Sequence, residues 1–159
     1  MEIYWLLGIP LTGGTFLGLW GSRKNAPEIN AFFSFLTLLA AAFLTYRIVD
    51  QGPMIVGEGW FFIDSFNVFL VALTAFVAFT TALFSRPYMR IEKEHGKLND
   101  KRLRLYHSSY QIFIGAMFLA LTTNNMGILW VAMEAATLAT VLLVSLYRTP
   151  ASLEAAWKY

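Results

Sequence analysis

The chain has 159 residues, of which 57% are hydrophobic and 14% are charged, and its formal net charge is +2. Ordinary soluble domains carry roughly 25% charged residues, so this composition indicates a membrane protein instead of a soluble domain. The chain contains no cysteine, which excludes disulfides, thiolate zinc sites, iron–sulfur ligation and covalent haem attachment within these residues.

Five long apolar runs follow one another along the chain. At about 1.5 Å per helical residue, each is close to the length needed to cross the ~30 Å hydrocarbon core of a bilayer. The runs cover residues 3–20, 31–49, 60–84, 106–123 and 126–147. The sequence therefore predicts an all-α, polytopic transmembrane helix bundle with five spanning helices, forming a single membrane region over residues 1–159.

The first run has two features of a retained helix. Glu2 precedes it instead of basic residues, and no small-residue cleavage site follows it, so we expect it to stay in the protein and not to be a signal peptide. Gly14 and Gly18 have the four-residue spacing that lets helix backbones approach closely.

The connections between the runs are rich in turn-forming or charged residues. Residues 21–30 and 50–59 combine glycine, proline and charge, which predicts turns. Asn124 and Asn125 leave a very short fourth connection, so the last two runs are expected to form an antiparallel hairpin. Residues 85–105 carry many charges of both signs, and two interpretations remain open: a solvated basic loop, or a short amphipathic helix on the membrane surface.

The basic residues are distributed unevenly between the two ends of the predicted helices. If the runs cross the membrane in alternation, eleven of the twelve lysine and arginine residues fall on one side and only Arg47 falls on the other. The positive-inside rule then places the N-terminus outside and the tail after residue 147 in the cytoplasm. We expect an integral protein of the cytoplasmic (inner) membrane of a prokaryote, surrounded by lipid and without a nucleic-acid partner.

Glu134 is the most informative polar residue, because residues 126–147 contain no other charge. It lies about 12 Å from the start of this run, where an acid costs several kcal/mol unless it is protonated or paired. Such acids usually mark ion or proton paths, so Glu134 is a candidate proton-translocation residue. The alternative is a carboxylate that is only hydrogen-bonded between helices, for example through Thr137. Small residues on the same run would let a neighbouring helix approach and shield the acid: Ala132, Ala136 and Thr140.

Two further polar residues are candidates for proton translocation, although a structural explanation is favoured for both. Asp64 lies four residues into the third run and can reach the outer interface, with Asn67 one turn away as a hydrogen-bond partner. His107 begins the fourth run, where an interfacial histidine is the favoured interpretation. Because histidine titrates near neutral pH, proton uptake from the cytoplasm is the alternative for His107.

Other chemistries are not supported by the residue spacing. A membrane b-type haem usually needs two histidines that face each other at depth, but the second histidine, His95, lies in the charged connection. The chain has no glycine-rich phosphate loop, no HExxH motif and no recognisable Ser/His/Asp arrangement. We therefore expect no metal, no cofactor and no catalytic centre in this chain.

Three segments carry a resemblance to a known family. They are FFIDSFN at the start of the third run, FSRPYMR at its end, and TTNNMGILWVAMEAATLAT around Glu134. This pattern resembles the antiporter-like membrane subunits: the proton-pumping subunits of complex I, the membrane subunits of hydrogenase-4 and formate hydrogenlyase-type complexes, and Mrp-type cation/proton antiporters. Residues 124–159 are most similar to the hydrogenase-4 type.

The resemblance implies a partner for Glu134. It identifies Glu134 with the acid of the fifth helix, which in the family pairs with a lysine on the seventh helix and switches as protons move. It also implies that residues 155–159 belong to the start of a sixth helix. Because the resemblance covers only the first third of such a subunit, we expect other membrane subunits as partners, one of them supplying the missing helices and the lysine.

The leading functional hypothesis is an N-terminal antiporter-like subunit, or fragment, of a proton-translocating oxidoreductase of the hydrogenase-4 or NADH:quinone oxidoreductase type. The partner subunits would carry the redox chemistry. Two alternatives stay open: a structural or assembly subunit without transport, and part of a non-redox cation/proton antiporter or inorganic-carbon uptake system.

Overall fold

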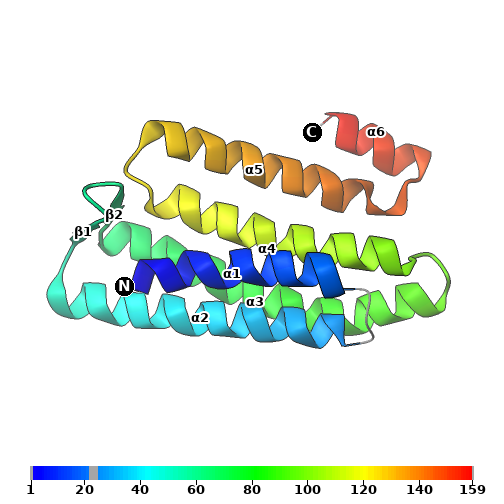
Figure 1. The fold of residues 1–159 in the computed structure, drawn as a ribbon, viewed down its shortest axis with the longest axis horizontal. Helices are drawn as coiled ribbons and strands as arrows, with labels where there is room; N and C mark the ends of the chain where they lie inside the picture. Colours follow the sequence, from blue (N-terminus) through cyan, green and yellow to red (C-terminus); the bar gives the residue numbers. More distant parts are fainter. Residues whose placement is uncertain (1, 22–24, 159) are drawn as a thin grey trace.

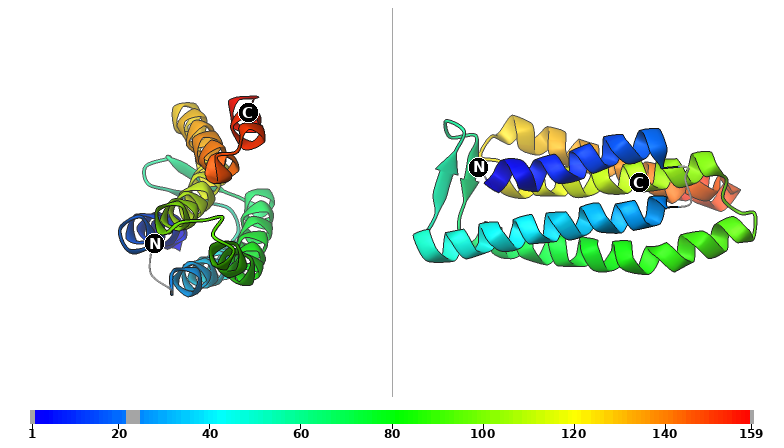
Figure 2. Two further views of the ribbon diagram at one scale, coloured as in Figure 1. Left: turned by 90° about the vertical axis from the view of Figure 1, so that its right-hand side faces the viewer. Right: turned by 60° about the horizontal axis from the view of Figure 1, so that its bottom comes forward.

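The computed structural model describes residues 2–21 and 25–158, and it consists mainly of long helices that lie side by side (Figure 1). The helices are α1 (Glu2–Trp20), α2 (Ala26–Gln51), α3 (Ser65–Glu94), α4 (Asp100–Thr122), α5 (Met126–Val144), the 3₁₀-helix η1 (Ser145–Tyr147) and α6 (Pro150–Lys158). Each long helix runs opposite to the one before it, as the two further views confirm (Figure 2). The expected alternation of the chain is therefore present.

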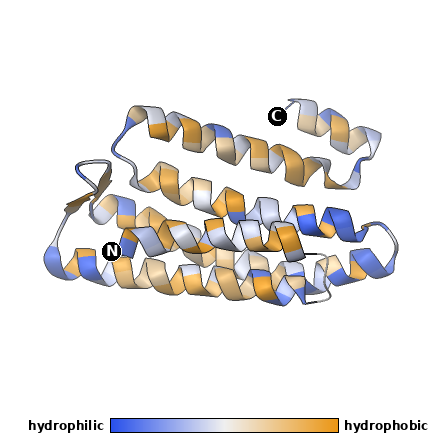
Figure 3. Ribbon diagram, viewed as in Figure 1, coloured by the Kyte–Doolittle hydropathy of each residue, from blue (hydrophilic) through white to orange (hydrophobic). Residues whose placement is uncertain are grey.

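Within the described residues, four helical stretches are long and apolar enough to cross a membrane: α1, α2, α3 and Met126–Tyr147. The protein is thus an integral membrane protein, but the five expected spans are not all confirmed. The fourth expected run lies in α4, whose first turns are hydrophilic whereas α5 is mostly hydrophobic (Figure 3). Helix α4 can carry these polar residues because of its position in the bundle. It contacts α1, α2, α3 and α5, so its polar side chains can face protein instead of lipid.

A short β-hairpin, which was not predicted, follows α2. Strands β1 (Met54–Val56) and β2 (Phe61–Ile63) pair antiparallel, and the turn between them uses positive φ angles at Gly57, Glu58 and Gly59. The third apolar run was expected to be helical from residue 60, but its first residues form β2. Apolar side chains suit a strand as well as a buried helix, so composition did not separate the two.

The segment expected as a long charged connection, residues 85–105, is mostly helical. Helix α3 continues through Pro87 to Glu94, and α4 begins at Asp100 after the Asn99 side chain caps it by accepting from Arg102 N at 2.9 Å. The surface-lying amphipathic helix is therefore not found in this segment. At about 1.5 Å per residue, α3 is about 45 Å long and its charged last turns extend beyond the ~30 Å hydrocarbon core.

Ion pairs join the charged ends of the helices. Glu28 at the start of α2 pairs with both Arg86 and Arg90 of α3. Lys93 of α3 pairs with Asp100 of α4 at 2.6 Å. These pairs are partly exposed, so they are worth little stability individually, but they hold the last turns of α3 against its neighbours.

Helices α1 and α4 approach closely at the two glycines with four-residue spacing. A Cβ atom added at Gly14 would lie 2.9 Å from Ile112 Cγ1, and one added at Gly18 would lie 3.1 Å from Ser108 Oγ. The Ser108 hydroxyl donates to the Gly14 carbonyl oxygen at 2.8 Å. The interface depends on the absence of side chains at these positions.

We predict that Gly14→Leu pushes α1 away from α4 and lowers the free energy of unfolding by about 1–3 kcal/mol, as overpacking does elsewhere. The matched control is Gly8→Leu in the same helix, because nothing lies within 4 Å of a Cβ added at Gly8. Unfolding of the detergent-solubilised protein measures both. Equal stability of the two variants would show that the close approach at Gly14 is unimportant.

Candidate functional site

Helix α5 carries the candidate site, and its start is fixed by the connection before it. The Asn125 side-chain oxygen accepts hydrogen bonds from Gly127 N at 2.9 Å and Ile128 N at 3.1 Å. The preceding Asn124 donates through Nδ2 to the Gly59 carbonyl oxygen at 3.0 Å, which ties the turn to the β-hairpin. Helices α4 and α5 therefore form the expected tight antiparallel hairpin (Figure 1).

One narrow face of α5 contacts the bundle. Its only buried residues are Ala132 and Ala139, and these small side chains let α5 lie close to α4. The remainder of α5 lies at the edge of the bundle (Figure 2). Its large exposed side chains are Met126, Trp130, Val131, Met133, Leu138 and Leu142.

Glu134 lies on the uncovered face of α5. With 3.6 residues per turn, it is about 200° around the helix from Ala132 and about 140° from Ala139, so it faces away from α4. Its side chain is exposed, and no hydrogen bond or ion pair of Glu134 occurs among residues 2–21 and 25–158. Glu134 therefore lies in the middle of an apolar helix, and its carboxylate has no partner within this part of the chain.

Two expectations about the surroundings of Glu134 need correction. Thr137 donates its hydroxyl to the Met133 carbonyl oxygen at 3.0 Å, so it is bonded to its own helix and not to the acid. Ala132, which was expected to bring a shielding neighbour to Glu134, instead brings α4 to the opposite side of α5. Any group that shields the acid approaches from another direction.

Asp64 has a local structural task at the start of α3. Its carboxylate accepts a hydrogen bond from Asn67 N at 2.8 Å and caps the helix. The Asn67 side chain donates to the Phe62 carbonyl oxygen at 3.0 Å, which links the cap to β2. Asn67 thus bonds to Asp64 as expected, through its backbone N–H.

His107 is fully buried within the helix bundle. None of its side chain is exposed, and neither ring nitrogen has a hydrogen-bond partner among the described residues. The reason is the length of α3, because its last turns, including Met89 and Lys93, extend beyond the predicted end at residue 84 and cover this part of α4. His107 faces α1–α3, whereas Glu134 faces away from all of them.

Sequence reasoning missed a buried polar cluster one turn deeper than His107. Gln111 Nε2 lies 2.9 Å from Asn30 Oδ1 and 3.1 Å from Ser34 Oγ, and all three residues are buried. The available signal was the four-residue spacing of His107 and Gln111, which puts both on one face of a helix. Within the described residues, no group of three His, Cys, Asp or Glu side chains could hold a metal ion.

One curated protein is similar in sequence to this chain. No protein-family model matches the chain. A curated relative, the Hydrogenase-4 component F homolog of Methylacidiphilum infernorum (isolate V4), is 43% identical over 150 residues, which cover 94% of this chain. The resemblance to the hydrogenase-4 type is thereby confirmed. The chain spans about 30% of the length of that hydrogenase-4 component.

Proposed function

We propose that the chain forms the N-terminal, antiporter-like part of a membrane subunit in a proton-translocating, hydrogenase-type complex, with Glu134 as its protonatable residue. The observation that carries this proposal is the position of Glu134, in the middle of an apolar helix and on the face that the bundle leaves uncovered. The 43% identity to a hydrogenase-4 component supports the type of complex.

An ionised carboxylate that faces lipid costs several kcal/mol, so Glu134 needs either a proton or a cationic partner. Because α4 occupies the opposite side of α5, that partner comes from outside the described residues. We propose a lysine on a further helix. Its approach favours the ionised carboxylate and its withdrawal favours the protonated form, so movement of the lysine would couple to proton uptake and release at Glu134.

The segment after α5 supports the presence of further helices beside it. The backbone of Arg148 adopts a left-handed conformation with φ 52°, and Thr149 Oγ1 then caps α6 by accepting from Ser152 N at 3.1 Å. Helix α6 turns back along α5 (Figure 1). We propose that α6 is the start of the sixth helix and leads the chain back toward the uncovered face of α5.

A purely structural function is the second candidate. The same uncovered apolar face favours it, because a neighbouring subunit could pack there and bond Glu134 without any proton movement. Loss of the Glu134 charge would then weaken assembly of the complex.

We predict that Glu134→Gln abolishes proton translocation by the assembled complex in membrane vesicles while leaving its assembly intact, because glutamine keeps the shape but cannot release a proton. The matched control is Asp64→Asn, since asparagine caps a helix as well as aspartate does and the same charge is removed. This control is expected to pump normally.

The possible results of this experiment separate the two candidate functions. Normal proton translocation by Glu134→Gln would contradict the proposed role of the acid. Failure of the Glu134→Gln complex to assemble, with Asp64→Asn assembled, would favour the structural function.

The orientation is also proposed, with the N-terminus outside and the charged ends of α3 and α4 in the cytoplasm. The absence of cysteine makes single-cysteine labelling of these residues possible. Glu58 and His95 are exposed in turns at opposite ends of the bundle. We predict that an impermeant maleimide added to intact cells labels Glu58→Cys and not His95→Cys; the reverse pattern would overturn the orientation.

A further inference from the structure

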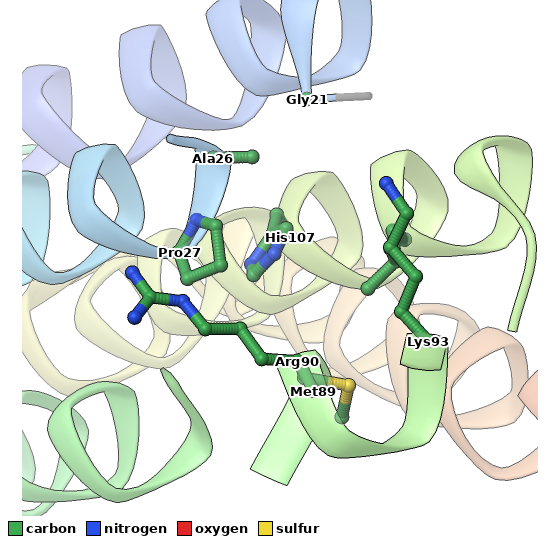
Figure 4. Close-up of a pocket in the computed structure, with 8 residues that line it drawn as sticks. Gly21, Ala26, Pro27, Met89, Arg90, Lys93 and His107 are labelled. Atoms are coloured by element: carbon green, nitrogen blue, oxygen red, sulfur yellow. The ribbon is translucent and has the colours of Figure 1, made fainter. Parts of the chain in front are cut away.

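A small cavity lies at the charged end of the bundle, between the first turn of α2 and the last turns of α3, with His107 of α4 on its wall (Figure 4). Its volume is about 30 Å³. A cavity needs roughly 10–15 Å³ of this kind of space to hold one water molecule, as well as polar partners for that water. The cavity therefore has room for a water molecule but not for a cofactor or an organic substrate.

The imidazole of His107 supplies the polar atoms. A neutral imidazole has one N–H donor and one acceptor nitrogen, and both nitrogens of His107 lack a partner among the described residues although the side chain is fully buried. Buried polar atoms are rarely left unpaired, and ordered water is the usual partner where protein atoms supply none. Among the described residues, the nearest aromatic neighbour, Tyr106, makes only a ring contact with His107, with centroids 5.1 Å apart.

The cavity borders a route to the aqueous phase. Arg90 and Lys93 of α3 line it, and the same two side chains line a groove of about 550 Å³ together with Asn25 and Glu94. Both cationic side chains are partly exposed and are held by acids on other elements. Because long side chains change rotamer rapidly, movement of Arg90 or Lys93 would join the cavity to the groove.

We propose that this cavity is a binding site for one or two ordered water molecules that hydrogen-bond to His107, and that His107 exchanges protons with the cytoplasmic aqueous phase through them. In each exchange, the acceptor nitrogen takes a proton from water and the other nitrogen returns its proton to water, so the ring ends neutral. The site is independent of the proposed role of Glu134, because His107 faces α1–α3 and Glu134 faces away from α4.

Hydrogen–deuterium exchange at the C2 carbon of histidine, followed by mass spectrometry on the assembled complex in D₂O, tests the water site. His95 is exposed and provides an internal reference in the same sample. We expect His107 to exchange measurably but about tenfold or more slowly than His95, since its side chain is fully buried and water reaches it only through the small cavity. Undetectable exchange at His107 would overturn the proposal, and so would exchange as fast as that of His95.

A cavity-filling variant tests the location of the water. Ala26 lines the cavity and is buried, so Ala26→Val reduces the space beside His107. This variant is expected to slow exchange at His107 severalfold and to leave His95 unchanged. Unchanged exchange at His107 in an assembled Ala26→Val complex would contradict the proposed route. If this variant does not assemble, the wild-type comparison of His107 with His95 still decides the proposal.

Discussion

Polar side chains placed among apolar helices need a hydrogen-bond or charge partner, and α4 and α5 meet this constraint in opposite ways. Helix α4 turns its polar residues toward α1–α3, where Gln111 bonds to Asn30 and Ser34. Helix α5 is almost entirely apolar and has one acid, Glu134, which it turns away from α4. Protein atoms thus pair only some of the polar atoms of α4, and both ring nitrogens of His107 lack a partner among the described residues. Glu134 of α5 likewise has no partner within residues 2–21 and 25–158.

Small residues on its two neighbours place α4 at the centre of the bundle. Gly14 and Gly18 let α1 approach one side of α4, and Ala132 and Ala139 let α5 approach another. Because the contact with α4 uses the alanine face of α5, the rotation of α5 is fixed and Glu134 points outward. The packing of α1, α4 and α5 thus determines where a partner of Glu134 can bind.

Much of this arrangement could be predicted from the sequence. The lengths of the apolar runs predicted the helices and their alternation, and the pair Asn124 and Asn125 predicted the tight turn before α5. The isolated charge of Glu134 identified the candidate site without any structure. These features depend on local composition, which a sequence shows directly.

The features that could not be predicted depend on local competition or on tertiary contacts. The strand β2 is as apolar as the helix that follows it, so only the Asp64 cap separates the two. The charged residues after position 85 suggested a loop, but Glu, Lys and Arg are also good helix formers, and α3 continues through them. The burial of His107 follows from that extension and from packing between distant segments.

The central claim is that Glu134 faces a basic group from a helix outside residues 1–159. A structure of the assembled complex measures this most directly, through the distance from the Glu134 carboxylate to the nearest cationic side chain. The account predicts a lysine within about 6 Å, the range over which an opposite charge favours the ionised acid. A structure in which the outer face of α5 contacts lipid, with no cation near Glu134, would contradict it.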